Sequence, residues 1–174
     1  YVSSAKSGTM YLYCFRTNSS NLPSINSPQN NRFISFIYKI LTMEILAPVG
    51  DQAMLQAAIN AGADSIYFGI KEFNMRDSAK NFTIEEVKAF PEIKKYLTIN
   101  TIIYDEELDR VKEVLTELKD HIDAVICWDL AVIKIAKELE IPVHLSTQAS
   151  VANLKAIEQY KELGVERVIL AREL

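Results

Sequence analysis

One pattern recurs three times along this chain and constrains its fold more than any other feature. A helix-like stretch ends, an acidic residue follows within two positions, and a short apolar run comes next. The three copies lie at residues 61–69 (AGADSIYFG), 121–129 (HIDAVICWD) and 163–171 (LGVERVILA). Each copy is typical of a helix end that leads into a buried parallel strand. The repetition predicts an α/β protein whose ligands bind beyond the carboxyl ends of its strands.

The alternation of helices and strands begins at Met43. Asp51 and Thr83 are expected N-caps, and Glu86 completes a capping box with Thr83. Pro91 interrupts the helix that follows Thr83, so we expect that helix to be short or broken. We expect helices to begin near residues 51, 83, 105, 129 and 153, and strands near residues 44–47, 65–68, 97–101, 124–128, 142–146 and 167–171.

Six strands and five helices of this kind fit two architectures. A TIM barrel has eight of each, so the chain would be an incomplete (β/α) TIM-like barrel; the alternative is an open parallel sheet. We expect the incomplete barrel, with parallel strands inside and helices outside. Such a sheet leaves edge strands and apolar residues uncovered, so we also expect self-association through these edges.

Residues 1–42 differ from the rest of the chain. They contain four basic and no acidic residues, are rich in Ser and Asn, and lack the helix–strand alternation. Two explanations stay open: a leader such as a transit peptide, or translated sequence upstream of a start at Met43. In both cases we expect an unstructured extension outside the fold, and a single barrel domain over residues 43–174.

Charge and cysteine content exclude several functional classes. The 15 basic and 23 acidic residues after residue 42 give the domain a net charge of −8, which offers no general attraction to nucleic acid. The apolar run 33–41 is too short to span a bilayer, so we expect no membrane insertion. Cys14 and Cys127 form no metal-binding spacing, so we expect no metal site and no cofactor in this chain, and a cytoplasmic location. Cys127 is expected in the core.

Polar residues that follow different strands are the candidate site. In a parallel sheet they converge on one rim, and several are hydrogen-bond donors, so we expect a peptide or a polar, anionic small molecule as ligand. Asn100 binds either a ligand or a neighbouring backbone group. Gln148 suits hydrogen bonding to a ligand, and N-capping of the next helix by Ser146, Thr147 or Ser150 is the alternative explanation for these polar residues. The candidate substrate-binding residues are Lys71, Arg76, Asn100, Thr147, Gln148 and Arg172.

Other polar residues fall outside this rim. Asp64, Asp123 and Glu166 precede strands, so we expect them at the opposite end, where they contribute to stability rather than to catalysis. His144 lies in the middle of an apolar strand, where a core histidine is favoured over a general base. The chain has no glycine-rich phosphate loop, no nucleophile elbow and no zinc-protease motif. The residues alone therefore indicate an α/β domain with a polar rim, but no reaction.

Several segments together resemble peptidase family U32, the collagenase-like peptidases. They are residues 44–50 (EILAPVG), 62–69 (GADSIYFG), 144–149 (HLSTQA) and 163–174 (LGVERVILAREL), and their order and spacing also match. The resemblance covers residues 43–174 and implies a barrel-like domain. Between Phe82 and Tyr96 this chain is several residues shorter than the family pattern.

The resemblance implies two kinds of activity. Family members are described as peptidases, and others act in oxygen-independent hydroxylation of transfer RNA, ribosomal RNA or ubiquinone precursors. The second group implies RNA as a partner and, in full-length members, an iron–sulfur cluster whose cysteines lie mostly after the segment that ends at Leu174. We expect this chain to be a peptidase fragment incomplete for catalysis. Part of a hydroxylase and a binding-only domain without chemistry are the alternatives.

Overall fold

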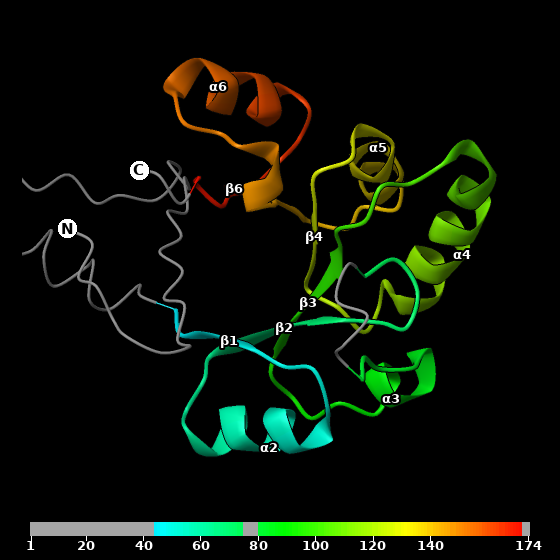
Figure 1. Ribbon diagram of the computed structural model, residues 1–174, viewed down its shortest axis with the longest axis vertical. Coiled ribbons are helices and arrows are strands. Elements are labelled where there is room, and N and C mark those ends of the chain that lie inside the picture. Colours follow the sequence, from blue (N-terminus) through cyan, green and yellow to red (C-terminus); the bar gives the residue numbers. More distant parts are fainter. Residues whose placement is uncertain (1–43, 75–79, 172–174) are drawn as a thin grey trace, which may run out of the picture.

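Six parallel strands form one curled sheet, an incomplete barrel. The computed structural model describes residues 44–74 and 80–171. In this part of the chain the strands are neighbours in chain order, which distinguishes the sheet from a doubly wound one, where the order reverses. Figure 1 shows the helices on the outer side of the curl. The strands are β1 (Leu46–Pro48), β2 (Ser65–Gly69), β3 (Lys94–Ile99), β4 (Ala124–Cys127), β5 (Val143–Leu145) and β6 (Arg167–Val168).

Five α-helices and two short 3-10 helices connect the strands within the described residues. Asp51, Thr83, Asp129 and Asn153 cap four of the α-helices through their side chains, and Thr83 and Glu86 form the expected capping box. The helices are α2 (Gln52–Asn60), α3 (Ile84–Lys88), α4 (Leu108–Leu118), α5 (Leu130–Glu138), α6 (Leu154–Glu162), η1 (Asp105–Glu107) and η2 (Thr147–Ala149). The alternation predicted from the sequence is confirmed.

Helix α3 is as short as the sequence predicts, whereas strands β3 and β6 differ from their predicted bounds. Helix α3 has five residues and ends before Pro91, as expected. The predicted start of the third strand was wrong by three residues, because Lys94 and Lys95 already pair with Ser65 and Ile66 of β2. Strand β6 has two residues, fewer than the five expected. The extension 1–42 lies outside the described residues.

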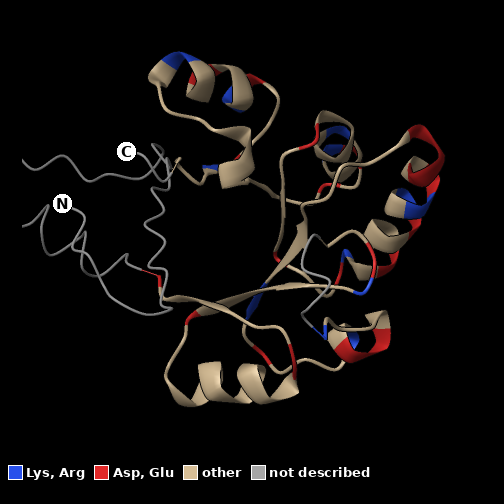
Figure 2. Ribbon diagram, in the orientation of Figure 1, with Lys and Arg blue, Asp and Glu red and all other residues tan. Residues whose placement is uncertain are grey.

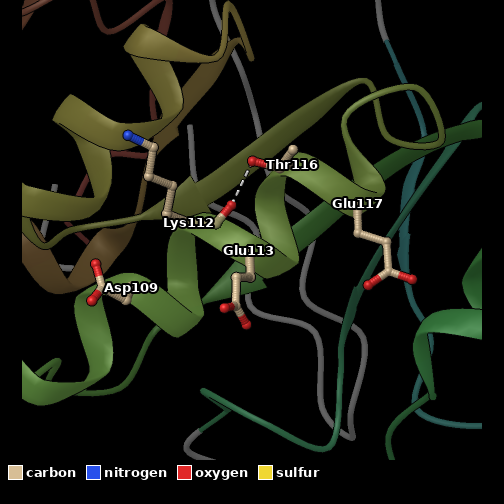
Figure 3. Close-up of a pocket in the computed structure, with 5 residues that line it drawn as sticks. All are labelled: Asp109, Lys112, Glu113, Thr116 and Glu117. Atoms are coloured by element: carbon tan, nitrogen blue, oxygen red, sulfur yellow. Dashed lines mark hydrogen bonds between the residues drawn. The ribbon is translucent and has the colours of Figure 1, made fainter.

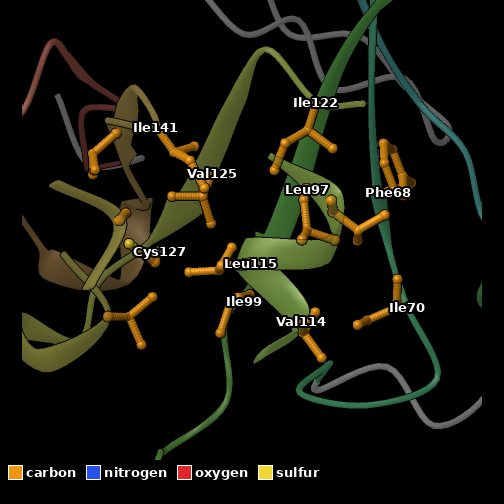
Figure 4. Packing of buried hydrophobic residues seen from close by; sticks show 14 of the residues in the cluster. Phe68, Ile70, Leu97, Ile99, Val114, Leu115, Ile122, Val125, Cys127 and Ile141 are labelled. Atoms are coloured by element: carbon orange, nitrogen blue, oxygen red, sulfur yellow. The ribbon is translucent and has the colours of Figure 1, made fainter. Parts of the chain in front are cut away.

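The hydrophobic core lies between the outer face of the sheet and the helices. Phe68, Leu97 and Ile99 point from the strands toward Val114 and Leu115 of α4 (Figure 4). All five are at most 2% exposed. Charged residues gather mainly on the outward-facing helices and loops, although α2 carries none (Figure 2). None of the helices in the described part combines the length and apolar character needed to cross a bilayer.

Cys127 is a core residue, as the sequence predicted. Its side chain is fully buried in the cluster between sheet and helices. Burial raises the pKa of the thiol to about 12, and the nearby carboxylate of Asp129 adds to the increase. The thiol therefore stays protonated at neutral pH and is a poor nucleophile or metal ligand.

The repeated acidic residues hold the amino ends of neighbouring strands. The backbone N–H of Ile45 donates to the Asp64 carboxylate at 2.8 Å, and that of Lys95 donates to the Asp123 carboxylate at 2.8 Å. The N–H of each of these acids also donates to a carbonyl of the preceding strand segment, and Glu166 does the same toward Val143. The recurring sequence pattern thus has a recurring structural role, since it joins β2 to the β1 segment, β4 to β3 and β6 to β5.

A charged network lies on the inner face of the sheet near its amino end. We call Glu44, Tyr96 and Arg167 the amino-end network. Arg167 Nη1 lies 2.9 Å from the Glu44 carboxylate, and the Tyr96 hydroxyl donates to the same carboxylate. Lys94 Nζ lies 3.9 Å from it. Because Glu44 precedes β1 and Arg167 belongs to β6, the ion pair connects the two edges of the curled sheet.

The network changes the acidity of its members. Burial alone would raise the pKa of Glu44, but the hydrogen bond from Tyr96 and the charges of Arg167 and Lys94 outweigh it, so the pKa is lowered. Burial, followed by the bond to Glu44, raises the pKa of Tyr96. The ring of buried His144 meets the Tyr96 ring edge-on, with centroids 4.7 Å apart. His144 is therefore a core histidine, the favoured of its two interpretations.

Candidate functional site

The carboxyl ends of β3, β4 and β5 meet at one backbone carbonyl. The indole N–H of Trp128 donates to the Asn100 carbonyl at 3.3 Å, and the side-chain amide of Gln148 donates to the same oxygen at 3.1 Å. We call Asn100, Trp128 and Gln148 the rim hub. Two donors on one acceptor fix the ends of three adjacent strands relative to one another.

The segment after β5 presents Gln148 through a tight local turn. The Ser146 hydroxyl accepts from the backbone N–H of Gln148 and lies 3.3 Å from its side-chain oxygen. Thr147 is the half-buried first residue of η2, and Ser150 ends the turn with φ of 52°. Ser146 caps the 3-10 helix η2, whereas Asn153, and not Ser146, Thr147 or Ser150, caps the next α-helix. The side-chain amide of Gln148 also donates to the Asn100 carbonyl.

The loop after β2 is tied to the same rim. The N–H of Asn100 donates to the carbonyl of Phe73 at 3.2 Å, which connects this loop to the rim hub. The side chain of Asn74 donates to that of Asn81 at 2.7 Å. Asn74 also packs so closely on Gly69 that a Cβ at position 69 would lie 1.7 Å from its amide nitrogen. A side chain at position 69 would therefore require the Asn74 side chain to move.

Buried aromatic rings attach this loop to the hydrophobic core. Phe82 closes the loop by pairing with Ile70, and its ring meets those of Phe68 and Phe90 edge-on at 6.0 and 4.8 Å. Phe82 is 2% exposed. Phe82 therefore belongs to the hydrophobic core, and Phe73 of the same loop packs against that core.

A small cavity of about 260 Å³ lies beside this loop. Its walls include Lys71, Glu72 and Arg110, and its floor includes Phe82. Both carboxylate oxygens of Glu72 accept from Arg110, at 2.9 and 3.0 Å, and this bond lowers the pKa of Glu72. Lys71 is exposed at the opening. The pair of Glu72 and Arg110 fastens the loop to α4, and of the described residues that line this cavity Lys71 is the exposed cation outside that pair.

A larger hollow of about 520 Å³ lies on the outer surface of α4 (Figure 3). Its lining residues project from a single helix and do not converge on a common point. The bond drawn there joins the Thr116 hydroxyl to the Lys112 carbonyl, one turn earlier in the same helix. We assign no site to this hollow, because a binding site needs polar groups that converge on a ligand.

The structure brings together part of the predicted site. Asn100, Thr147 and Gln148 lie at the ends of β3 and β5, and Lys71 lies on the loop after β2, which contacts Asn100. Arg76 and Arg172 lie outside the described residues. Trp128 was missed, although its place directly after β4 and its status as the single tryptophan were available signals.

The rim hub can bind polar groups but has no catalytic arrangement of its own. Among residues 44–74 and 80–171, no three His, Cys, Asp or Glu side chains are placed to hold a metal ion. The one cysteine in this part, Cys127, is buried on the helix side of the sheet. These residues do not fit the iron–sulfur cluster that the family resemblance implies for full-length members. The arrangement suits recognition of a polar ligand.

Comparison with known proteins relates the chain to one family. The model of peptidase family U32 matches residues 50–174. A collagenase of Porphyromonas gingivalis is 46% identical over 139 residues, which are 75% of this chain and 33% of that protein. An uncharacterized protease of Methanocaldococcus jannaschii is 42% identical over 142 residues, 78% of this chain and 35% of that protein.

A relative with a different name matches the same region. The tRNA hydroxylation protein P1 of Bacillus subtilis is 37% identical over 139 residues, 75% of this chain and 33% of that protein. The chain thus spans about a third of the length of these relatives. No solved structure matches it.

Proposed function

Because this chain belongs to peptidase family U32, we propose that it is the substrate-binding part of a longer U32 protein and that its carboxyl-end rim binds a peptide. Two relatives with protease names are 46% and 42% identical to it over 139 and 142 aligned residues. The observation that carries the proposal is the rim hub, where four connections after strands meet around Asn100. Cleavage would require residues beyond those described.

Each rim residue has a role in this proposal. Lys71 and Thr147 offer an ammonium group and a hydroxyl to the ligand. Trp128 and Gln148 act as positioning residues, because both donate to the Asn100 backbone carbonyl and so hold the end of β3 against the ends of β4 and β5. The buried thiol of Cys127 has no part in the reaction, because it faces the helices and its pKa is raised.

Part of an RNA hydroxylase is the second candidate function. It is supported by the tRNA hydroxylation protein P1, which is 37% identical over the same region. In that case the rim would bind a nucleotide, and the protein would act in the cytoplasm with its partner RNA. We rank it second, because the protease names have the higher identities and the domain after residue 42 carries a net charge of −8.

Fluorescence of the single tryptophan tests the proposal. Trp128 lies in the rim hub, so a ligand there should change its emission. The chain is titrated with soluble gelatin fragments and, separately, with bulk transfer RNA. We expect gelatin fragments to bind, and Thr147→Ala to weaken binding about fivefold, equivalent to about one lost hydrogen bond.

Thr116→Ala is the matched control, because Thr116 lies on the exposed face of α4 and bonds only its own helix. It should leave gelatin binding unchanged. Saturable binding of transfer RNA with no response to gelatin would replace the peptide proposal by the hydroxylase one. Equal effects of the two threonine substitutions would move the site away from the rim.

A further inference from the structure

Large apolar side chains are exposed around the outer edge of the carboxyl rim. Ile102 and Tyr104 are 62% and 60% exposed, and Leu130 and Leu154 are 61% and 74% exposed. A single exposed apolar side chain is ordinary, but four on one side of a sheet indicate an interaction surface.

The topology places these four residues on the same rim as the hub. Ile102 and Tyr104 follow β3, Leu130 is the first residue of α5 and Leu154 is the first residue of α6. Helices α4 and α5 pack against each other and run in the same direction, because parallel strands precede both. The starts of these helices therefore lie at the carboxyl ends of neighbouring strands, beside Asn100, Trp128 and Gln148.

The charge of this part of the rim has one sign. Residues 100–109, 128–133 and 146–154, which follow β3, β4 and β5, contain no Lys or Arg. Asp105 and Glu106 are exposed between Tyr104 and α4, and Asp109 is exposed at the start of that helix. The rim is thus acidic after β3 and apolar after β3, β4 and β5, whereas the loop after β2 carries Lys71 and Lys80 beside Glu72.

We propose that the loops after β3, β4 and β5 form a specificity surface, the acidic–apolar rim, for peptides in which apolar side chains alternate with Lys or Arg. This inference rests on the proposed peptide-binding function and names its substrate class. Apolar side chains of the peptide pack on Tyr104, Leu130 and Leu154, and its cationic side chains face Asp105 and Glu106. A phosphate backbone would be repelled by these acids, so RNA does not fit this surface.

Two synthetic peptides of equal length test the inference. One alternates Leu with Lys and the other alternates Leu with Glu, and both are titrated against the chain with Trp128 fluorescence as the signal. We expect the Leu–Lys peptide to bind about tenfold more tightly. Asp105→Lys combined with Glu106→Lys should reduce this preference about fivefold, because it reverses two charges on the surface.

The matched control reverses two acids at the carboxyl end of α4, as Glu117→Lys with Asp120→Lys. Both residues are exposed at the opposite end of α4 from Asp105 and Glu106, and the variant makes the same change in net charge. It should keep the preference for the Leu–Lys peptide. Leu130→Ser should weaken the binding of both peptides, because it removes apolar contact area. Leu130 is exposed, so the substitution leaves no cavity in the core.

The outcomes separate this inference from the function on which it rests. Equal affinity for the two peptides, or equal loss of preference in the rim and control variants, overturns the acidic–apolar rim. If gelatin fragments still bind in a Thr147-dependent manner, the peptide-binding function survives that result. If transfer RNA competes with the Leu–Lys peptide at this surface, the inference and the peptide-binding function both fail.

Discussion

The two ends of the curled sheet are held together by different chemistry. At the amino end, carboxylates of Asp64 and Asp123 accept backbone N–H groups of neighbouring strands, and the pair of Glu44 and Arg167 joins the first strand to the sixth. At the carboxyl end, neutral side chains of Trp128 and Gln148 donate to one carbonyl. At the amino end charge therefore serves cohesion, whereas at the carboxyl end Lys71, Asp105 and Glu106 remain exposed beside the ion pair of Glu72 and Arg110.

This difference fits the general division of a barrel into a stabilising face and a functional face. A charged side chain that already bonds another group of the protein has few hydrogen-bonding positions left for a ligand. Around the carboxyl end, Lys71, Asp105 and Glu106 are exposed next to polar groups of fixed position. We therefore expect substitutions at the amino end to affect the free energy of unfolding, and substitutions at the rim to affect the affinity for a ligand.

The largest effect should come from breaking the amino-end network. The Glu44 side chain is 15% exposed, and Arg167→Met removes its closest cation. We expect this substitution to lower the free energy of unfolding by about 3 kcal/mol. Urea unfolding measures this loss. The double variant Glu44→Gln with Arg167→Met should recover part of it, because no unpaired charge remains. If the double variant were as unstable as the single one, packing rather than charge would explain the cost.

The pH dependence of stability should show the same network. The pKa of Glu44 is lowered in the folded state, so its contribution is fully present above its unfolded pKa of about 4.3 and is lost as the pH falls through the lower folded value. Between about pH 5 and pH 2, Glu44→Gln should therefore lose less stability than the parent chain. Parallel unfolding curves of the two proteins over this window would contradict the assignment.

Asp123→Ala should have a smaller effect, also on stability. It removes the carboxylate that accepts the Lys95 N–H at 2.8 Å, a charge-assisted bond worth about 1.5 kcal/mol. Thermal unfolding of the variant gives the loss. Glu117→Gln is the control, because its exposed ion pair with Lys88 should contribute at most about 0.5 kcal/mol. Similar losses in the two variants would remove the special role of the repeated acids.

Rim substitutions should have the smallest effect on stability. Trp128→Phe replaces the indole by a smaller aromatic ring and removes the N–H that donates to Asn100, while Gln148 still donates to that carbonyl. We expect a loss of about 0.5–1 kcal/mol in urea unfolding, followed by tyrosine fluorescence or circular dichroism. A loss of several kcal/mol would mean that the rim hub holds the barrel together as the amino end does.

Much of the fold could be predicted from the sequence, because its signals are local. Asp51, Thr83 and Asn153 cap helices through neighbouring backbone groups, and Pro91 limits its own helix. The start of β3 could not be predicted in the same way. Lys94 and Lys95 are not typical strand residues, and they become strand by pairing with β2, which is distant in sequence.

The candidate site could be located from the sequence, but its bonds could not. Strand ends converge in any parallel sheet, so Asn100, Thr147 and Gln148 were expected on one rim. That Gln148 donates to a carbonyl 48 residues away, and Trp128 to the same carbonyl 28 residues away, depends on the curl of the sheet. The bond from Tyr96 to Glu44 spans 52 residues for the same reason.

One paired measurement tests the central claim that the carboxyl rim binds and the amino end stabilises. Affinity for gelatin fragments, from Trp128 fluorescence, and the free energy of unfolding are measured together for Gln148→Ala and Asp123→Ala. The account predicts that Gln148→Ala weakens binding with a small loss of stability, and that Asp123→Ala lowers stability with unchanged affinity. Loss of binding in Asp123→Ala, with Gln148→Ala binding like the parent chain, would contradict it.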